Sequence, residues 1–330
     1  MKYKGKKVAF YTLGCKLNFS ETSTIAASFV KAGFTRVEFA EKADVYVINT
    51  CSVTNHGDKT SRNIIRRAIK QNHQALVIVT GCYAQLKPDE IARIKGVDFV
   101  LGAHEKFDTP ACLANLKKRE TPEIRTSSFA NIKSYHHSFS WGDRTRSFLK
   151  IQDGCDYFCS YCTIPLARGR SRNDTIANTV AEARKVVQKG CKEIILTGVN
   201  IGDFGKSTGE NFLELLKALE KTDGLHRLRL GSTEPNLLKD EIIELVANSK
   251  VIMPHFHIPL QAGSDKVLAL MKRRYTTNLF AHRIHKIREI VPHAFIGVDV
   301  IAGTNGETEA LFRESYDFIK ELEISQLHAF

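Results

Sequence analysis

The stretch from Lys150 to Arg172, KIQDGCDYFCSYCTIPLARGRSR, is the most informative part of the chain, because three cysteines lie within eight residues of it. Cys155, Cys159 and Cys162 have the spacing C-x3-C-x2-C. Thiolates hold iron–sulfur clusters and normally supply four ligands, so three local thiolates predict a cubane cluster with one iron open to a small molecule. A structural zinc site or a group of reduced core cysteines are the alternatives, although zinc spacings use two close pairs of ligands.

Three more cysteines are spread over the first hundred residues, and each follows an apolar, strand-like run. They are Cys15 in YTLGCKLN, Cys51 in VINTCSVT and Cys82 in VTGCYAQ. Parallel strands end at the same edge of a sheet, where α/β folds place their ligands. We therefore expect these thiols to converge and to hold a second cluster with one open iron. Three buried cysteines that end three buried strands are the alternative; Cys112 and Cys191 have no comparable placement and are interpreted as small apolar residues.

Strand-like and helical stretches alternate along the chain, which predicts an α/β fold. The first part predicts an open parallel sheet, with strands near 8–13, 45–49, 76–80 and 97–101 and helices near 20–32, 58–72 and 88–95. Segment 104–147 predicts a short helix around Cys112 and then a linker. The last part predicts an incomplete barrel of six βα steps, with strands near 148–152, 193–197, 226–230, 255–260, 294–300 and 324–330 and helices near 176–189, 211–222, 239–248, 276–290 and 308–322. The expected domains are residues 1–120, a linker at 121–143, and residues 144–330.

Composition indicates a folded protein of the cytoplasm. The chain has 330 residues, 43% of them hydrophobic, which is enough for the cores of two ordinary domains. Its basic start does not fit a secretory signal, and no run approaches the roughly 18 apolar residues of a membrane span. Disulfides are rare in the cytoplasm, so eight cysteines indicate metal or catalytic chemistry.

The net charge of +12 is concentrated in the first part of the chain. Residues 1–147 hold 24 Lys and Arg against 13 Asp and Glu. The helical stretch 59–73 places Arg62, Arg66 and Lys70 on one face. An excess of positive charge in one domain favours contact with the phosphates of a nucleic acid, and a solvated basic surface is the alternative.

Glycine-rich loops follow the strands expected in the barrel, at 197–205, 231–235, 259–264 and 302–309. Functional groups of such barrels lie on the loops after the carboxyl ends of the strands, so these loops and the cysteine trio are expected to line one mouth. Glu234 is a candidate acceptor for ribose hydroxyl groups. The pairs His255 with His257, and His282 with His285, are not assigned a metal, because no third ligand is evident in the sequence.

The motifs TLGCKLN, INTCSVT and VTGCYAQ, followed by the cysteine stretch, LTGVNIG and HFHIPLQ, resemble the radical S-adenosylmethionine (SAM) methylthiotransferases over nearly the whole chain. TLGCKLN and TGCYAQ favour the branch that acts on N6-threonylcarbamoyladenosine in tRNA. The resemblance implies two 4Fe-4S clusters, an auxiliary one and one that cleaves SAM. The implied ligands are Cys15, Cys51 and Cys82 for the first cluster and Cys155, Cys159 and Cys162 for the second; the implied SAM-pocket residues are Tyr161, Gly198, Asn200, Glu234 and Gln261.

The resemblance also implies the reaction. A methylthio group would be added to carbon 2 of N6-threonylcarbamoyladenosine at position 37, beside the anticodon, with SAM as methyl donor and radical source. A small electron-donor protein such as a flavodoxin is an expected partner, and no catalytic side chain is identified. The alternatives within the family act on N6-isopentenyladenosine or on a ribosomal protein, and a cluster-binding RNA module or electron carrier without catalysis is a further rival.

The chain departs from the family pattern at four positions. Gly231 stands in place of a serine, Ala262 replaces the serine of QSGS, and Thr304 with Asn305 replaces the Phe-Pro of GFPGE. These changes concern the shape of the SAM pocket. Family members continue beyond the barrel into a small RNA-binding TRAM domain, whereas this chain ends at Phe330, so weakened tRNA binding is expected for the chain as given.

Overall fold

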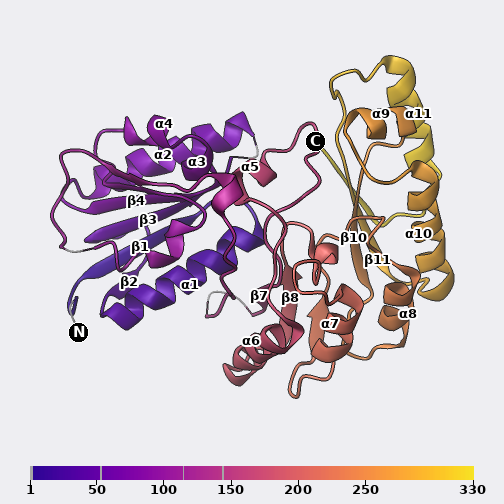
Figure 1. Ribbon diagram of the computed structural model, residues 1–330, viewed down its shortest axis with the longest axis horizontal. Helices are drawn as coiled ribbons and strands as arrows, with labels where there is room; N and C mark the ends of the chain where they lie inside the picture. The colour runs from indigo at the N-terminus through magenta and orange to yellow at the C-terminus, as the bar shows by residue number, and fades with distance from the viewer. Residues whose placement is uncertain (1–2, 53, 114, 143–144) are drawn as a thin grey trace. The chain divides into compact units, whose positions relative to one another are not determined.

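The computed structural model describes residues 3–52, 54–113, 115–142 and 145–330, which form two compact units (Figure 1). Unit 1 comprises Met1–Arg144 and the short segment Thr163–Arg170. Unit 2 comprises Thr145–Cys162 and Ser171–Phe330. The chain thus leaves unit 2 directly after Cys162 and returns to it at Ser171. The domain boundaries at residues 120 and 143 stay predictions.

Unit 1 is built on a parallel six-stranded sheet, in agreement with the α/β fold expected from the sequence. The strand order is β2-β1-β3-β4-β5-β6. The strands are β1 (Lys7–Thr12), β2 (Thr35–Val37), β3 (Val45–Thr50), β4 (Leu76–Gly81), β5 (Phe99–Leu101) and β6 (Glu123–Arg125). Every residue of β3 and β4 is buried, as central strands of a parallel sheet require. The edge strands β2 and β6 were not predicted, because their sequences TRV and EIR each contain a single apolar residue, whereas the equally short β5 is the apolar run FVL.

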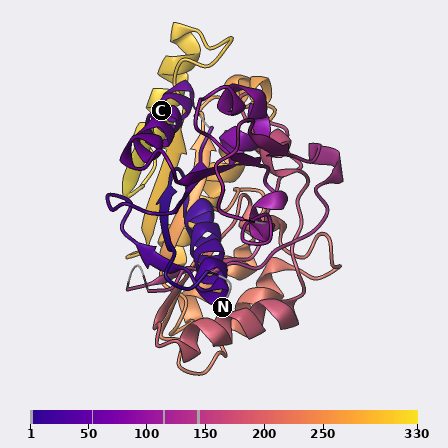
Figure 2. The same cartoon turned by 90° about the vertical axis from the view of Figure 1, so that its left-hand side faces the viewer.

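Helices cover both faces of this sheet (Figures 1 and 2). Successive strand residues point to opposite faces, and each face has its own core. One core joins Val8, Val47 and Ile78 to Phe29 of α1 (Lys16–Ala32). The other joins strand residues to α2 (Asn55–Gln71), α3 (Cys82–Leu86) and α4 (Pro88–Ala92). Helix α1 ends at Gly33, whose φ of 107° is the left-handed conformation favoured by glycine.

The helix expected around Cys112 does not form. A 3-10 helix spans Glu105–Asp108, and the backbone N–H of Cys112 donates to Asp108 in a turn that contains Pro110. Proline lacks an N–H and disfavours a continuing helix. Cys112 and Leu113 are instead buried in the core beneath α1. Unit 1 also contains a 3-10 helix at Phe129–Asn131 and the short helix α5 (Ile164–Arg168).

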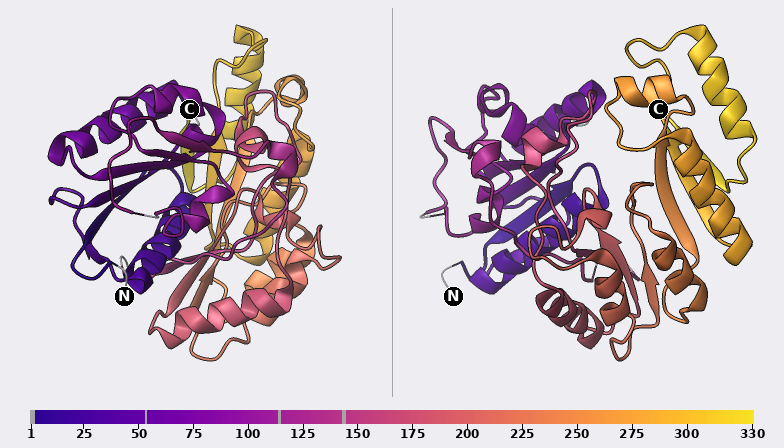
Figure 3. Two further views of the ribbon diagram at one scale, coloured as in Figure 1. Left: turned by 60° about the vertical axis from the view of Figure 1, so that its left-hand side comes forward. Right: turned by 45° about the vertical axis from the view of Figure 1, so that its right-hand side comes forward.

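Unit 2 is the partial barrel, and its strands form two three-stranded parallel sheets (Figure 3). One sheet has the order β7 (Ser147–Lys150), β8 (Glu193–Thr197), β9 (Arg227–Arg229), and the other has the order β10 (His255–Gln261), β11 (Phe295–Val300), β12 (Gln326–Ala329). Single parallel bridges at Leu228–Ile252 and Ser232–His257 continue the strand sequence between them. The helices are α6 (Ile176–Gln188), a 3-10 turn (Ile201–Asp203), α7 (Phe212–Leu219), α8 (Asp240–Asn248), α9 (Asp265–Leu270), α10 (Thr277–Ile290) and α11 (Glu309–Lys320).

Side-chain caps fix where several of these helices begin. Thr175, Asn211, Thr276 and Thr308 each accept a hydrogen bond from a backbone N–H in the first turn of the helix that follows. Because each helix starts at a defined residue, the loop before it has a fixed length. The loops before α7 and α11 follow the carboxyl ends of β8 and β11, and the first of these loops carries Gly198 and Asn200.

Candidate metal centres

The structure brings the three dispersed cysteines of unit 1 to one edge of the sheet. Thr50 and Gly81 are register partners on β3 and β4, so Cys51 and Cys82 are the next residues of neighbouring strands. Cys15 is the N-cap residue of α1, three residues beyond the end of β1. A Cβ on Gly14 would lie 2.9 Å from Cys51 Sγ, so the loop that carries Cys15 runs directly against Cys51. The convergence expected from the strand order is confirmed.

Buried polar side chains beneath the cysteines hold the three loops in place. Asn18 Nδ2 donates to the backbone oxygens of Leu13, at 2.9 Å, and Thr50, at 3.1 Å. Asn49 Nδ2 donates to the Asn18 oxygen at 3.0 Å, and the Thr50 hydroxyl donates to Thr80. These bonds join the backbone just before each cysteine, so the spacing of the thiols depends on them.

The three cysteines of unit 1 differ in their exposure to solvent. Cys15 is exposed, Cys51 is half-buried and Cys82 is buried. Burial raises the pKa of the Cys82 thiol to about 11, although the cations of Arg168 and Lys106 favour its thiolate. Metal ligation requires the thiolate, so a metal at this edge would have to displace a firmly held proton from Cys82. Because Cys15 is exposed, a metal can reach this edge of the sheet from its side.

The local trio of unit 2 occupies a tight loop after β7. Cys162 N–H donates to the Cys159 oxygen at 3.0 Å, and Tyr157 N–H donates to Cys155 Sγ at 3.4 Å. Phe158 has a φ of 51°, a conformation uncommon for a residue with a side chain. Burial raises the pKa of the Cys155 thiol to about 12. This turn brings the three cysteines together on one short loop.

An arginine that sequence reasoning missed contacts this trio. Arg273 donates to Cys159 Sγ at 3.1 Å and forms an ion pair with Glu234. Its guanidinium also lies within 3.4 Å of the hydroxyl of Tyr161. The sequence predicted Glu234 as an acceptor for ribose hydroxyls; in the structure its carboxylate accepts from Arg273, and burial raises its pKa. No motif marks Arg273, which lies in the short connection after α9.

The remaining SAM-pocket candidates follow β8 and β10. Gly198 lies against Gln152, whose backbone oxygen would be 2.9 Å from an added Cβ. Gln152 Oε1 accepts the N–H of Asn200 at 2.8 Å. The Asn200 side chain is buried, and among the described residues neither of its amide atoms has a hydrogen-bond partner. A buried amide without partners is costly, so this position fits a polar ligand.

The other two SAM-pocket candidates, Tyr161 and Gln261, line different cavities. Tyr161 lines a cavity of about 340 Å³ together with Thr304 and Asn305, two of the residues that depart from the family pattern. Gln261 lines a different, largely apolar cavity of about 370 Å³. Gln261 has a φ of 69°, next to a register shift in β10. Tyr161 and Gln261 thus line two different cavities.

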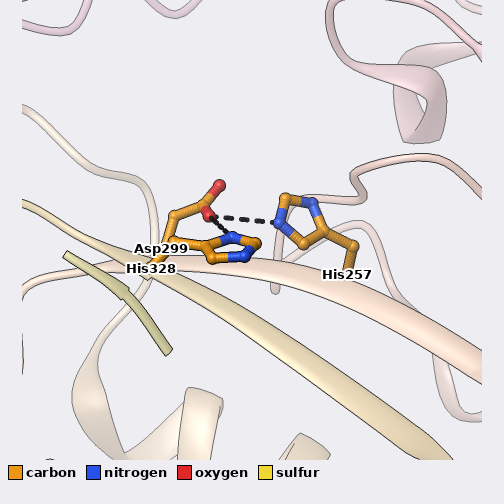
Figure 4. A group of neighbouring side chains, drawn as sticks. All are labelled: His257, Asp299 and His328. Atoms are coloured by element: carbon orange, nitrogen blue, oxygen red, sulfur yellow. Dashed lines mark hydrogen bonds and ion pairs between the residues drawn. The ribbon is translucent and has the colours of Figure 1, made fainter. Parts of the chain in front are cut away.

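A second missed group is a hydrogen-bonded triad on the last three strands (Figure 4). The imidazoles of His257 and His328 each lie 3.1 Å from the same carboxylate oxygen of Asp299. These two contacts lower the pKa of Asp299 despite its partial burial. No third partner for His257 was evident from the sequence, because Asp299 and His328 are 42 and 71 residues further along. Hydrogen bonding to one carboxylate accounts for this arrangement.

Two protein families match this chain, one over much of unit 1 and the other over most of unit 2. Residues 7–102 match the family described as "Uncharacterized protein family UPF0004", and residues 149–319 match the radical SAM superfamily. The threonylcarbamoyladenosine tRNA methylthiotransferase MtaB of Bacillus subtilis (strain 168) is 44% identical over 98% of this chain and 72% of its own length. The chain belongs to the radical SAM methylthiotransferases.

More distant relatives of this methylthiotransferase have related names or share its fold. A tRNA-2-methylthio-N(6)-dimethylallyladenosine synthase of Clostridium botulinum (strain Hall) is 33% identical over 97% of this chain and 73% of its own length. The solved structure of the radical SAM methyltransferase TsrM from Kitasatospora setae has a TM-score of 0.70 at 16% identity, and the match covers 98% of this chain and 73% of that one. At this identity the likeness concerns the fold alone.

Membership in the radical SAM family implies that this methylthiotransferase uses a 4Fe-4S cluster and SAM. The residues of unit 2 fit that pair, because three thiols share one loop and Asn200 presents a buried amide without a partner. None of the described helices is long and apolar enough to cross a membrane. The assignment of individual residues as ligands stays a prediction.

Proposed function

We propose that this radical SAM methylthiotransferase modifies tRNA and adds a methylthio group to carbon 2 of N6-threonylcarbamoyladenosine next to the anticodon. The observation that carries this proposal is the 44% identity to the Bacillus subtilis protein. Relatives of the same name in Aquifex aeolicus and Thermotoga maritima are 38% and 37% identical over 98% of the chain. Relatives named as dimethylallyladenosine synthases are 33% identical or less, which favours the threonylcarbamoyl substrate.

The proposed ligands form two sets, one in each unit. Cys155, Cys159 and Cys162 would hold the cluster that binds SAM. Cys15, Cys51 and Cys82 would hold a second 4Fe-4S cluster, and the support for it is their convergence at the carboxyl edge of the sheet. When bound, the clusters and SAM supply the radical and the methylthio group, because such chemistry belongs to the cofactors.

The side chains of the chain place and orient these groups. Arg273 would hold the Cys159 sulfur and the Glu234 carboxylate in fixed positions. Asn200 would offer its amide to the polar end of SAM, and Gly198 leaves room for close approach of the backbone. Tyr161 and Gln261 are also proposed as SAM-pocket residues. No side chain is proposed as a general acid or base.

The RNA and the electron donor complete the proposal. An adenosine beside the anticodon lies in a loop, so it can enter a pocket without opening a duplex. The excess of basic residues in the first part of the chain favours contact with phosphates. We further propose that a small electron-donor protein such as a flavodoxin supplies the electron and that the enzyme acts in the cytoplasm.

Digestion of total tRNA from a strain that lacks the gene tests the substrate. We expect the 2-methylthio form to disappear and N6-threonylcarbamoyladenosine to accumulate, as measured by mass spectrometry of nucleosides. Complementation with a Cys159→Ala variant should not restore the product, whereas the unaltered gene should. Loss of the dimethylallyl product instead would assign the enzyme to the alternative substrate, and an unchanged tRNA profile with an altered ribosomal protein would reject tRNA altogether.

A further inference from the structure

A buried group of charges lies in unit 1 close to the three dispersed cysteines. It consists of Glu21 on α1, Lys106 in the 3-10 helix Glu105–Asp108 and Arg168 at the end of α5. Each residue is at most 1% exposed. Charged groups are almost never buried this completely unless they are paired, because leaving water is costly. Hydrogen bonds within the group explain how its charges are paired. They do not explain why unit 1 buries three charged residues at this place.

The two cations share one carboxylate. Lys106 Nζ donates to Glu21 Oε2, and Arg168 donates to Glu21 Oε1 at 3.1 Å and Oε2 at 3.0 Å. The arginine thus uses its planar fork on both carboxylate oxygens, which a lysine cannot do. Helix α5, which ends with Arg168, packs against α3, whose first residue is Cys82.

The same arginine is connected to the backbone in front of the cysteines. Arg168 donates to Asn18 Oδ1 at 2.6 Å, and the amide nitrogen of Asn18 donates to the Leu13 and Thr50 oxygens. Leu13 precedes Gly14 and Cys15, and Thr50 precedes Cys51. One guanidinium therefore fixes the Asn18 side chain, and Asn18 fixes two of the three cysteine loops.

We propose that Arg168, held by Glu21 together with Lys106, is a positioning residue for the second cluster, which it orients through Asn18 and whose reduced state it stabilises by its positive charge. This inference rests on the proposed function, because it presupposes a cluster on Cys15, Cys51 and Cys82. Hydrogen bonds and net charge around a cluster set its reduction potential. A reduced cluster carries one more negative charge, so a nearby buried cation raises the potential and a nearby carboxylate lowers it.

The test isolates the second cluster in the full-length chain. Cys155, Cys159 and Cys162 are replaced by alanine, the protein is reconstituted with iron and sulfide, and the remaining cluster is titrated potentiometrically with detection by electron paramagnetic resonance. For Arg168→Gln we expect about a tenfold loss in the reduction equilibrium constant, or ~59 mV to more negative potential for one electron. Glu21→Gln should move the potential in the opposite direction.

Two further variants separate the charge from the bonds and from general effects. Arg168→Lys keeps the charge and should keep the potential near that of the parent, while its iron is lost faster to a chelator. Lys118→Met is the matched control, since Lys118 pairs with buried Asp98 beside the amino end of β4. That pair lies about 20 Å along the strand from Cys82, at roughly 3.3 Å per residue, so its loss should leave the potential unchanged.

The outcomes distinguish this inference from the proposed function. Shifts of opposite sign for Arg168→Gln and Glu21→Gln, with Lys118→Met unchanged, support the inference. Unmoved potentials, or shifts of the same sign, overturn it and leave the second cluster standing. If Arg168→Gln retains no iron, Lys106→Met provides the charge test, with a shift to more negative potential expected and no shift refuting the charge effect. A parent that forms no cluster on the first trio overturns the second cluster and the inference with it.

Discussion

Replacing Gly81 by alanine should disturb the edge of unit 1 where the three cysteines meet. Gly81 has φ 98° and ψ −166°, a backbone conformation almost restricted to glycine. A Cβ at this position would lie less than 3.0 Å from Asn49 Oδ1, Thr50 N and Thr50 O. Two of these atoms belong to the backbone of β3, which is buried and cannot move aside.

The expected cost has two parts. A side chain in this backbone conformation costs about 1–3 kcal/mol, and overpacking a buried site costs a further ~1–3 kcal/mol. The free energy of unfolding should therefore fall by about 2–6 kcal/mol, and the melting temperature of unit 1 should fall by roughly 4–24 °C. Because Cys82 follows directly, its displacement from Cys51 should also lower the iron bound by the first trio.

Differential scanning calorimetry of the apo protein and iron analysis after reconstitution measure the two effects. The matched control is Gly5→Ala in the same unit, because Gly5 also has a positive φ, 83°, but nothing lies within 4 Å of an added Cβ. It should cost only the strain of the backbone, about 1 kcal/mol. If Gly81→Ala melts no lower than Gly5→Ala and binds the same iron, the close approach of β3 and β4 does not set the spacing of Cys51 and Cys82.

The remaining predictions concern charge. In the apo protein Cys82 should stay a thiol until the pH approaches about 11, so alkylation followed by peptide mass spectrometry should modify exposed Cys15 first; equal rates at pH 8 would contradict this. Arg273→Gln should destabilise unit 2 by about 3–5 kcal/mol, because it leaves the Glu234 carboxylate buried without its cation; addition of Glu234→Gln should recover part of the loss in urea unfolding. Arg66→Gln, at an exposed position of α2 beside other cations, should reduce the salt dependence of tRNA binding by about 0.7 in the log–log slope, whereas an unchanged slope would place the RNA elsewhere.

Much of the arrangement in unit 1 followed from local sequence. β1, β3 and β4 are continuous apolar runs, and parallel strands must end at one edge, so the convergence of Cys15, Cys51 and Cys82 needed no knowledge of tertiary contacts. The edge strands β2 and β6 escaped prediction, because TRV and EIR contain only one apolar residue each. The helix expected near Cys112 does not form, because Pro110 disfavours continuation of the 3-10 helix Glu105–Asp108.

The contacts that sequence could not predict join residues far apart in the chain. Arg273 reaches Cys159 across 114 positions, and Arg168 reaches Glu21 across 147. Neither arginine belongs to a spacing pattern with its partner, since such pairs form only when separate elements pack together. In the sequence, no turn motif, capping position or periodic pattern marks Arg273. A count of charged residues does not distinguish it from an arginine on the solvated surface.

Arg168 changes how the cysteine stretch itself is interpreted. In the sequence it lies six residues after Cys162, so it would be assigned to the site that the local trio forms. In the fold, Thr163–Arg170 belongs to unit 1, and Arg168 is buried against α1, where its hydrogen bonds lead to the loops of Cys15 and Cys51. The motif CTIPLARGR therefore serves both trios: its cysteine belongs to one, and its first arginine supports the loops of the other. A substitution at Arg168 should accordingly alter unit 1 first, even though Cys162, six residues before it, belongs to the trio of unit 2.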